Sequence, residues 1–210
     1  MPKIKYKKER IQKEVINTQK DQELRCSNAL ISGLSMLRLM GDHNTVNCDC
    51  EELEGYGNST SFEIKRLNGN SNFVRSMKRE MKVSGCGSRN ILHCDLGEFC
   101  GSWNHITGTV EKLEEGSEDN YILGNVYELN GNGNYVSGYV LNLTGEKNMI
   151  MGYTKRVNGD DNEIHGDVDV INGNNNLVFG NVNMILGGTG NRVFGTANFD
   201  SGKDNTHKNK

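Results

Sequence analysis

Short alternating runs of apolar and polar residues return about every fourteen positions along most of this 210-residue chain. Each copy opens with an asparagine followed by x-(Val/Ile)-x-Gly, as in NYILG at Asn120 and NYVSG at Asn134. Alternation with a period of two is typical of a strand with one buried face. A second apolar pair follows at positions seven and ten, so each copy predicts two short strands joined by turns. The asparagines that open the copies are Asn44, Asn58, Asn72, Asn90, Asn104, Asn120, Asn134, Asn148, Asn162, Asn176 and Asn191.

The repeat predicts an all-β parallel β-solenoid (a β-roll or β-helix) of about eleven 14-residue coils over residues 42–199. One coil is too short to bury its own apolar row, but stacked coils bury a continuous one. An even repeat keeps the same positions inward and places asparagine over asparagine, so that the side-chain amides can bond from coil to coil. Glycines at positions five and twelve let the two sheets approach closely or supply a positive φ at the corners.

The composition agrees with a repeat protein. The chain holds 26 Gly, 29 Asn and a single proline, Pro2, and only 34% of its residues are hydrophobic. A solenoid needs many turns, and proline would remove a ladder donor almost anywhere in it. The net charge of −3 gives no reason to expect a nucleic-acid-binding body, and no apolar stretch is long enough to span a membrane.

Each fourteen-residue copy divides into two segments of seven residues, each with one short strand and one turn. This N-x-(Val/Ile)-x-Gly pattern resembles the head domains of trimeric autotransporter adhesins, which are parallel β-rolls of three chains side by side. The resemblance covers about Asn44 to Phe199 and implies a homotrimer with an attachment role. Similar solenoids recur in viral spikes and fibres. The family favours Ser and Ala where this chain has Asn and Val or Ile, and no secretion signal, stalk or anchor is visible. We therefore expect cytoplasmic synthesis and incorporation into a virion.

The positions that face outward on the first strand carry a largely apolar and aromatic stripe in the later coils. Such a stripe usually marks an interface, and we expect it to bind a partner, first of all two further copies of this chain. The alternatives are that a tail or a folded-back helix covers the stripe, or that inward and outward are exchanged. In the early coils the same positions are polar, for example Thr45 and Ser59. The expected interface residues are Tyr121, Leu123, Tyr135, Met149, Met151, Leu177, Phe179 and Phe194.

The two ends of the chain differ from the repeat. Residues 1–41 begin with a basic arm, and residues 8–25 predict a charged helix. The spacing of Leu30, Leu34 and Leu37 suits a helical, apolar cap over the first coil, because open solenoid ends need covering. Residues 28–41 could alternatively form one more degenerate coil. The polar residues 200–210 are expected to be a disordered tail.

Two irregular spacings predict loops inserted at Lys78–Lys82 and Glu114–Asp119, which either contribute to a binding face or are tolerated variation. The cysteines do not match a zinc pattern, and buried reduced thiols are the better interpretation of Cys48, Cys50 and Cys94. Cys86 and Cys100 lie fourteen residues apart, so they are placed to form a disulfide in an oxidising compartment. We expect no catalytic residues, no metal and no cofactor.

These features predict a non-enzymatic structural or attachment protein, a rigid homotrimeric rod that presents a protein-binding or glycan-binding surface. The alternative is an intracellular scaffold whose solenoid face binds a partner and whose basic N-terminal arm contacts nucleic acid. No membrane association is expected.

Overall fold

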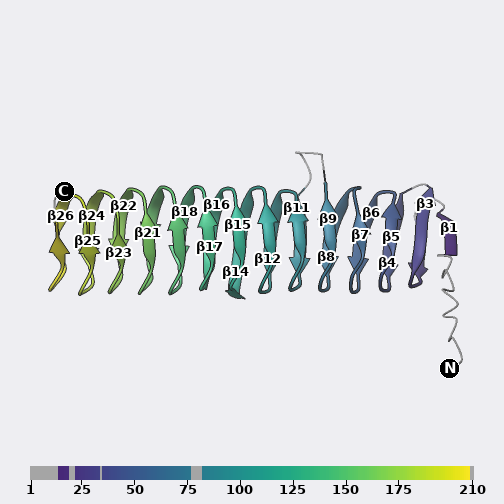
Figure 1. Cartoon of the computed structure of the whole chain (residues 1–210), viewed down its shortest axis with the longest axis horizontal. Helices are drawn as coiled ribbons and strands as arrows, with labels where there is room; N and C mark the ends of the chain where they lie inside the picture. Colours follow the sequence, from purple (N-terminus) through teal and green to yellow (C-terminus); the bar gives the residue numbers. More distant parts are fainter. Residues whose placement is uncertain (1–13, 19–21, 34, 77–81, 209–210) are drawn as a thin grey trace, which may run out of the picture.

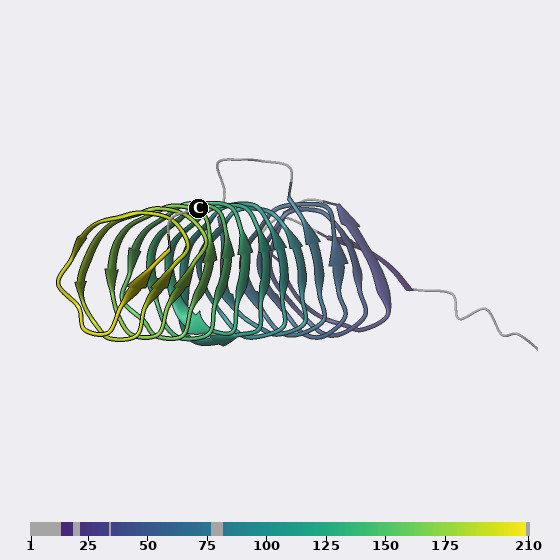
Figure 2. The same ribbon diagram turned by 60° about the vertical axis from the view of Figure 1, so that its left-hand side comes forward.

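The computed structural model shows a rod whose first described strand lies at one end and whose last described strands lie at the other (Figure 1). It describes residues 14–18, 22–33, 35–76 and 82–208. Successive turns of the chain stack as closed coils of similar outline (Figure 2). Each coil adds one strand to each of two parallel sheets, one of fourteen strands (sheet A) and one of thirteen (sheet B). A parallel β-solenoid with two strands in each coil of about fourteen residues is therefore confirmed, with about thirteen turns.

Sheet A contains the odd-numbered strands in sequence order, because the chain returns to this sheet once in every coil. Its strands are β1 (Glu14–Thr18), β3 (Ala29–Gly33), β5 (Thr45–Asn47), β7 (Ser59–Thr60), β9 (Phe73–Arg75), β11 (Ile91–His93), β13 (His105–Thr107), β15 (Tyr121–Leu123), β17 (Tyr135–Ser137), β19 (Met149–Met151), β21 (Glu163–His165), β23 (Leu177–Val178), β25 (Arg192–Val193) and β27 (Thr206–His207).

Sheet B contains the even-numbered strands, again in sequence order. Its strands are β2 (Glu23–Arg25), β4 (Met36–Met40), β6 (Cys50–Glu54), β8 (Ile64–Asn68), β10 (Val83–Cys86), β12 (Leu96–Cys100), β14 (Val110–Glu118), β16 (Val126–Asn132), β18 (Val140–Thr144), β20 (Thr154–Val157), β22 (Val168–Asn172), β24 (Val182–Gly187) and β26 (Ala197–Asp200).

The core is a set of aliphatic columns between the two sheets. In sheet A, Ile122 pairs with Val136, and Val136 with Ile150, so position three of each coil lies over position three of the next. These side chains are 0% exposed. Positions seven and ten of sheet B face them, as Val140 and Leu143 do. The fourteen-residue period thus determines both which side chains are buried and which coil neighbours they contact.

The ladder asparagines hold the corner where each coil enters sheet A, and all eleven are at most 1% exposed. The backbone N–H of Asn134 donates to Asn148 Oδ1 at 2.9 Å. The Asn134 amide Nδ2 donates to the Ser117 carbonyl and to Asn148 Oδ1, each at 3.1 Å. Every polar atom of the buried amide is therefore paired, which is the condition for burying it at low cost. The ladder also has a twelfth member, Asn205, whose Oδ1 accepts from the Asn191 N–H at 2.9 Å.

The residue before each ladder asparagine has a positive φ, whatever its side chain. His43 has a φ of 57°, Trp103 of 63° and Lys147 of 57°. From the sequence we expected a positive φ only at glycines, because bulky side chains such as these give no sign of a left-handed backbone conformation. Glycine is required elsewhere, for example at Gly152, where a Cβ would lie 2.1 Å from the Gly138 carbonyl oxygen.

The expected helical cap is wrong for the residues that the structure describes. No helix occurs within them, and β1 to β4 instead form further coils of the solenoid. The alternative of an extra coil at residues 28–41 is confirmed, because Ile31 and Leu39 stack on Val46 and Leu53 in the inward columns and are 0% exposed. Burial in these columns outweighs the helical spacing of the leucines, of which Leu37 is exposed. Residues 1–13, with most of the basic arm, lie outside the described residues.

The expected disordered tail is also replaced by structure as far as residue 208. Strand β26 ends at Asp200, and β27 pairs with β25, Thr206 with Arg192 and His207 with Val193. The solenoid therefore extends beyond the expected boundaries of 42 and 199 on both sides. The polar side chains of this segment do not prevent it from folding, because its strands still pair with those of the preceding coil.

Candidate functional site

The short strands of sheet A determine which side chains the rod presents on this side. Each strand turns its third position inward and its second and fourth positions outward, as Ile122 is buried between Tyr121 and Leu123. The eight residues expected at an interface all lie on this outer face. Five are exposed by 36–41% and Tyr135, Leu177 and Phe194 are half-buried. Their role as an interface remains a prediction.

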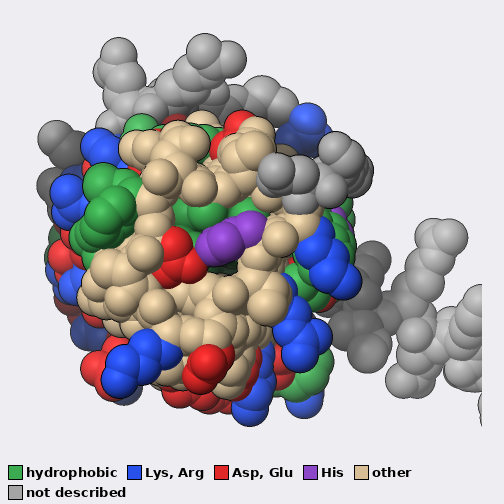
Figure 3. Space-filling model, turned by 90° about the vertical axis from the view of Figure 1, so that its left-hand side faces the viewer, with side chains coloured by type: hydrophobic (Ala, Val, Ile, Leu, Met, Phe, Trp, Pro, Cys, Tyr) green, Lys and Arg blue, Asp and Glu red, His purple; other side chains and the backbone are tan. Residues whose placement is uncertain are grey.

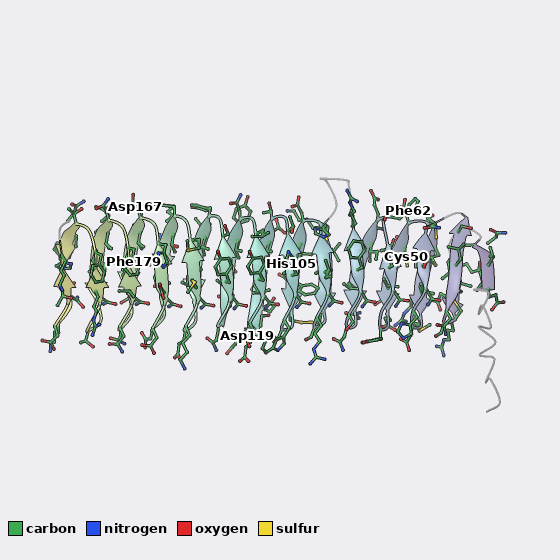
Figure 4. All side chains as sticks on the ribbon, viewed as in Figure 1. Cys50, Phe62, His105, Asp119, Asp167 and Phe179 are labelled. Atoms are coloured by element: carbon green, nitrogen blue, oxygen red, sulfur yellow. A yellow bond between two sulfur atoms is a disulfide. The ribbon has the colours of Figure 1, made fainter. Side chains whose placement is uncertain are left out.

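The outward side chains form two columns along the rod, because equivalent positions of successive coils are in register. The rings of Tyr121 and Tyr135 stack with centroids 4.9 Å apart and planes 4° apart. In the second column Phe179 stacks on Phe194 at 5.1 Å. Figure 4 labels Phe179 and His105, which lie along this row of strands. The ring faces are covered by their neighbours, so the rings present their edges to a partner.

The apolar face begins earlier in the chain than the sequence predicted. Phe73 and Ile91 occupy the second position of their coils and are 36% and 44% exposed. His93 connects them to the later rings, since it contacts Phe73 with ring centroids 5.7 Å apart. The eighteen-residue spacing between Asn72 and Asn90 obscured this continuity. The apolar side chains of the stripe therefore extend back to Phe73, with polar ones among them.

Single polar residues such as Ser137 and Arg192 interrupt the apolar columns, and one coil carries a polar pair. His165 Nε2 lies 2.6 Å from Glu163 Oε1, and both side chains are about one-third exposed. The His165 ring also stacks on Phe179 with centroids 4.7 Å apart. The His165 ring therefore continues the aromatic column, and its polar atom is paired with Glu163. The pair makes the stripe more polar at this level but keeps its stacked shape.

The outer face of sheet B carries a different pattern, with charged residues paired between coils. Arg38 Nη2 lies 2.6 Å from Glu54 Oε1 and Arg38 Nε 3.3 Å from Glu52 Oε2. The hydrogen bond with Glu54, together with the nearby carboxylates, raises the pKa of the Arg38 guanidinium above its ordinary value. Lys65 pairs with Glu51 in the same way. Exposed ion pairs of this kind contribute little stability each. This face is therefore a solvated surface on which positive and negative side chains balance each other.

The C-terminal coils of sheet B lose this charge. Leu186 and Phe199 are 52% and 53% exposed there, beside the outward positions of Val170 and Met184. This change from polar to apolar agrees with the expectation from the sequence. The apolar area is shorter than the stripe on sheet A, which continues over nine coils.

The cysteines are placed as the sequence predicted. Cys48, Cys50 and Cys94 are buried free thiols, and burial raises the pKa of both Cys50 and Cys94 to about 12. A thiol with so high a pKa is a poor nucleophile or metal ligand at neutral pH. Cys86 and Cys100 lie opposite each other in β10 and β12 and form a disulfide. No group of three or more metal-binding side chains occurs in the described part of the chain.

The two expected insertions have different outcomes. Most of Lys78–Lys82 lies outside the described residues. The second insertion is a bulge inside β14 rather than a separate loop at Glu114–Asp119, because Leu113 pairs with Leu129 and Ser117 with Gly131. The residues between leave the ladder and form one wall of a polar groove with Asn130 and Thr144. A binding role for the bulge remains a prediction.

The described residues include no helix long and apolar enough to cross a membrane. Comparison with models of known protein families, with curated proteins and with solved structures finds no match to this chain.

Proposed function

We propose that this chain is a non-enzymatic structural or attachment protein, a rigid rod that associates as a homotrimer through the outer face of sheet A. The observation that carries the proposal is the largely apolar and aromatic stripe from Phe73 to Phe194, which runs along nine coils of sheet A. A solenoid suits this role, because each coil is fixed by its neighbours and the side chains of one column keep a constant spacing.

The dimensions of the stripe support an interface. Nine coils at a strand spacing of about 4.8 Å give a length of about 40 Å. Two columns of side chains are about 10 Å wide, so the stripe covers on the order of 400 Å². A stable interface buries about 800 Å² on each partner. The stripe therefore supplies the apolar centre of the interface, and polar residues beside it supply the rim.

The ring geometry favours a protein partner over a glycan. A sugar ring packs against the flat face of an aromatic side chain, but the faces of Tyr121 and Tyr135 are covered by each other. Their exposed edges and hydroxyl groups instead suit packing between the side chains of another protein surface. Three copies in parallel would bring the same rings of each chain to the same level.

The disulfide between Cys86 and Cys100 supports a mature location outside the reducing cytosol, as for a virion or fibre component. The alternative function, a scaffold whose basic arm contacts nucleic acid, depends mainly on residues 1–13, which lie outside the described residues. No contact of the described residues favours it.

Sedimentation equilibrium of the full chain tests the proposal. We expect a mass three times the 23.4 kDa of one chain. The double variant Tyr135→Glu/Met149→Glu places two charges at the centre of the stripe and should sediment as a monomer. Tyr127→Glu is the matched control, because Tyr127 is 44% exposed on the outer face of sheet B. A monomeric wild type, or a double variant that remains trimeric, would contradict the proposal.

A further inference from the structure

The inward columns of the solenoid change chemistry in the last described coil. In sheet A, Val178 pairs with Val193, and Val193 with His207. In sheet B, Ile185 pairs with Asp200. A histidine and an aspartate thus stand at two positions that carry buried aliphatic side chains in most of the other coils.

These two side chains meet across the end of the rod. His207 Nε2 lies 2.7 Å from Asp200 Oδ2, and the pair joins a strand of sheet A to a strand of sheet B. Asp200 Oδ1 also accepts from the Gly202 N–H and from Asn205 Nδ2, each at 2.8 Å. A view onto this end shows histidine and acidic side chains at the centre of the coil (Figure 3).

The N-terminal end formed by the described residues has the opposite character at the same positions. Ile16 pairs with Ile31 and Leu24 with Leu39, so an aliphatic pair closes the columns there. Both side chains are only partly buried, although they pack against the core. Two copies stacked end to end would therefore bring Asp200 and His207 against Ile16 and Leu24.

We infer that the Asp200–His207 pair is a built-in stop that prevents a second copy of this chain from stacking on the C-terminal end of the solenoid. Within the described residues, the strands at each end of the two sheets have a neighbouring strand on one side only, and such edges invite stacking. Head-to-tail contacts of this kind do not close and would produce filaments. Burying the carboxylate and the imidazole against aliphatic side chains would remove their water without offering a new partner. This inference does not depend on the proposed trimer.

The test replaces the pair with the residues of the preceding coil, as Asp200→Ile/His207→Val in the full chain. Rod lengths are measured by negative-stain electron microscopy over a range of protein concentrations, with circular dichroism to confirm the fold. We expect the double variant to form rods at least twice as long as the wild type, growing with concentration, while wild-type rods keep one length.

The matched control is Asn198→Ile/Thr206→Val, which adds similar apolar groups to the same two strands at exposed, outward positions. It should keep the wild-type rod length. The single variant His207→Val retains Asp200 and its bonds to Gly202 and Asn205, so it serves if the double variant does not fold. We expect it to lengthen the rods to a smaller extent. Folded variants that keep the wild-type length at every concentration, or a control that lengthens equally, would overturn the inference.

Discussion

Thr154 offers a sharp test of the core, because it is a polar residue in an otherwise aliphatic column. It pairs with Val140 in one neighbouring coil and with Val168 in the other, and it is 0% exposed. Its Oγ1 atom has no hydrogen-bond partner among the described residues. The substitution Thr154→Val replaces this hydroxyl with a methyl group of nearly the same shape, so it leaves neither a cavity nor a clash.

The expected gain follows from the two changes at this site. An unsatisfied buried hydroxyl costs about 1–3 kcal/mol, and a buried methyl group contributes about 0.8 kcal/mol. We therefore expect Thr154→Val to raise the free energy of unfolding by about 2–4 kcal/mol. Urea titration followed by far-ultraviolet circular dichroism measures this as a higher midpoint. Midpoints are compared at equal slope, because a long repeat array can lose two-state behaviour.

Thr60→Val is the matched control for this substitution. Thr60 is also inward and only 2% exposed, but its Oγ1 accepts a hydrogen bond from the Phe62 N–H at 3.0 Å. Valine should therefore destabilise the protein there by about 1 kcal/mol or more. If Thr154→Val lowered the midpoint, or if both variants shifted it in the same direction, the assignment of an unpaired hydroxyl in the core would be refuted.

Three further predictions concern the corners and the C-terminal end. Asn134→Ala removes the side chain that makes four hydrogen bonds at the corner and should cost about 4 kcal/mol in a urea titration. Gly152→Ala would place a Cβ within 2.1 Å of a backbone oxygen at a φ of +151°, so we expect it to lower the midpoint strongly or to prevent folding. Partial burial alone would raise the pKa of Asp200, but hydrogen bonds from Asn205, Gly202 and His207 outweigh burial and hold it below the ordinary 3.8. The stability from this shift is present above the ordinary pKa and is lost as pH falls through the lowered one, so Asp200→Asn should flatten the acid limb of a pH–stability profile.

Matched substitutions distinguish these effects from general damage. Asn130→Ala changes an asparagine outside the ladder, and a cost equal to that of Asn134→Ala would show that the ladder adds nothing. Gly116 has a φ of +79° but nothing within 4 Å of an added Cβ, so Gly116→Ala should cost only the backbone strain of about 1–3 kcal/mol. A smaller loss at Gly152 than at Gly116 would contradict the close approach of neighbouring coils.

The period of the repeat explains why so much of the fold could be predicted. Alternation identifies Ile122 as inward and Tyr121 as outward, and the constant spacing of fourteen assigns each residue its neighbours above and below. The Asn ladder follows from the same register. A motif this regular constrains local structure and long-range pairing together, which is rare in globular proteins.

The errors lie where the period breaks. Residues 28–41 lack the opening asparagine, so the leucine spacing favoured a helix although Ile31 and Leu39 belong to the buried columns. Asn205 was missed because its coil carries His207 where an aliphatic residue is expected. An insertion of two residues shows in the spacing, but the spacing does not say whether they form a loop or a bulge within β14. These outcomes depend on how side chains pack between coils, and a local sequence pattern does not show this.

The most direct test of the central claim, that the outer face of sheet A is an interface, is hydroxyl-radical footprinting of the assembled protein with detection by mass spectrometry. Met149 and Met151 are 38% and 40% exposed in the single chain, and Tyr127 on sheet B is 44% exposed. The account predicts that both methionines are protected from oxidation in the assembly while Tyr127 reacts as its exposure dictates, and that Tyr135→Glu/Met149→Glu removes the protection of Met151. Full reactivity of Met149 and Met151 in the assembled wild-type protein would contradict it.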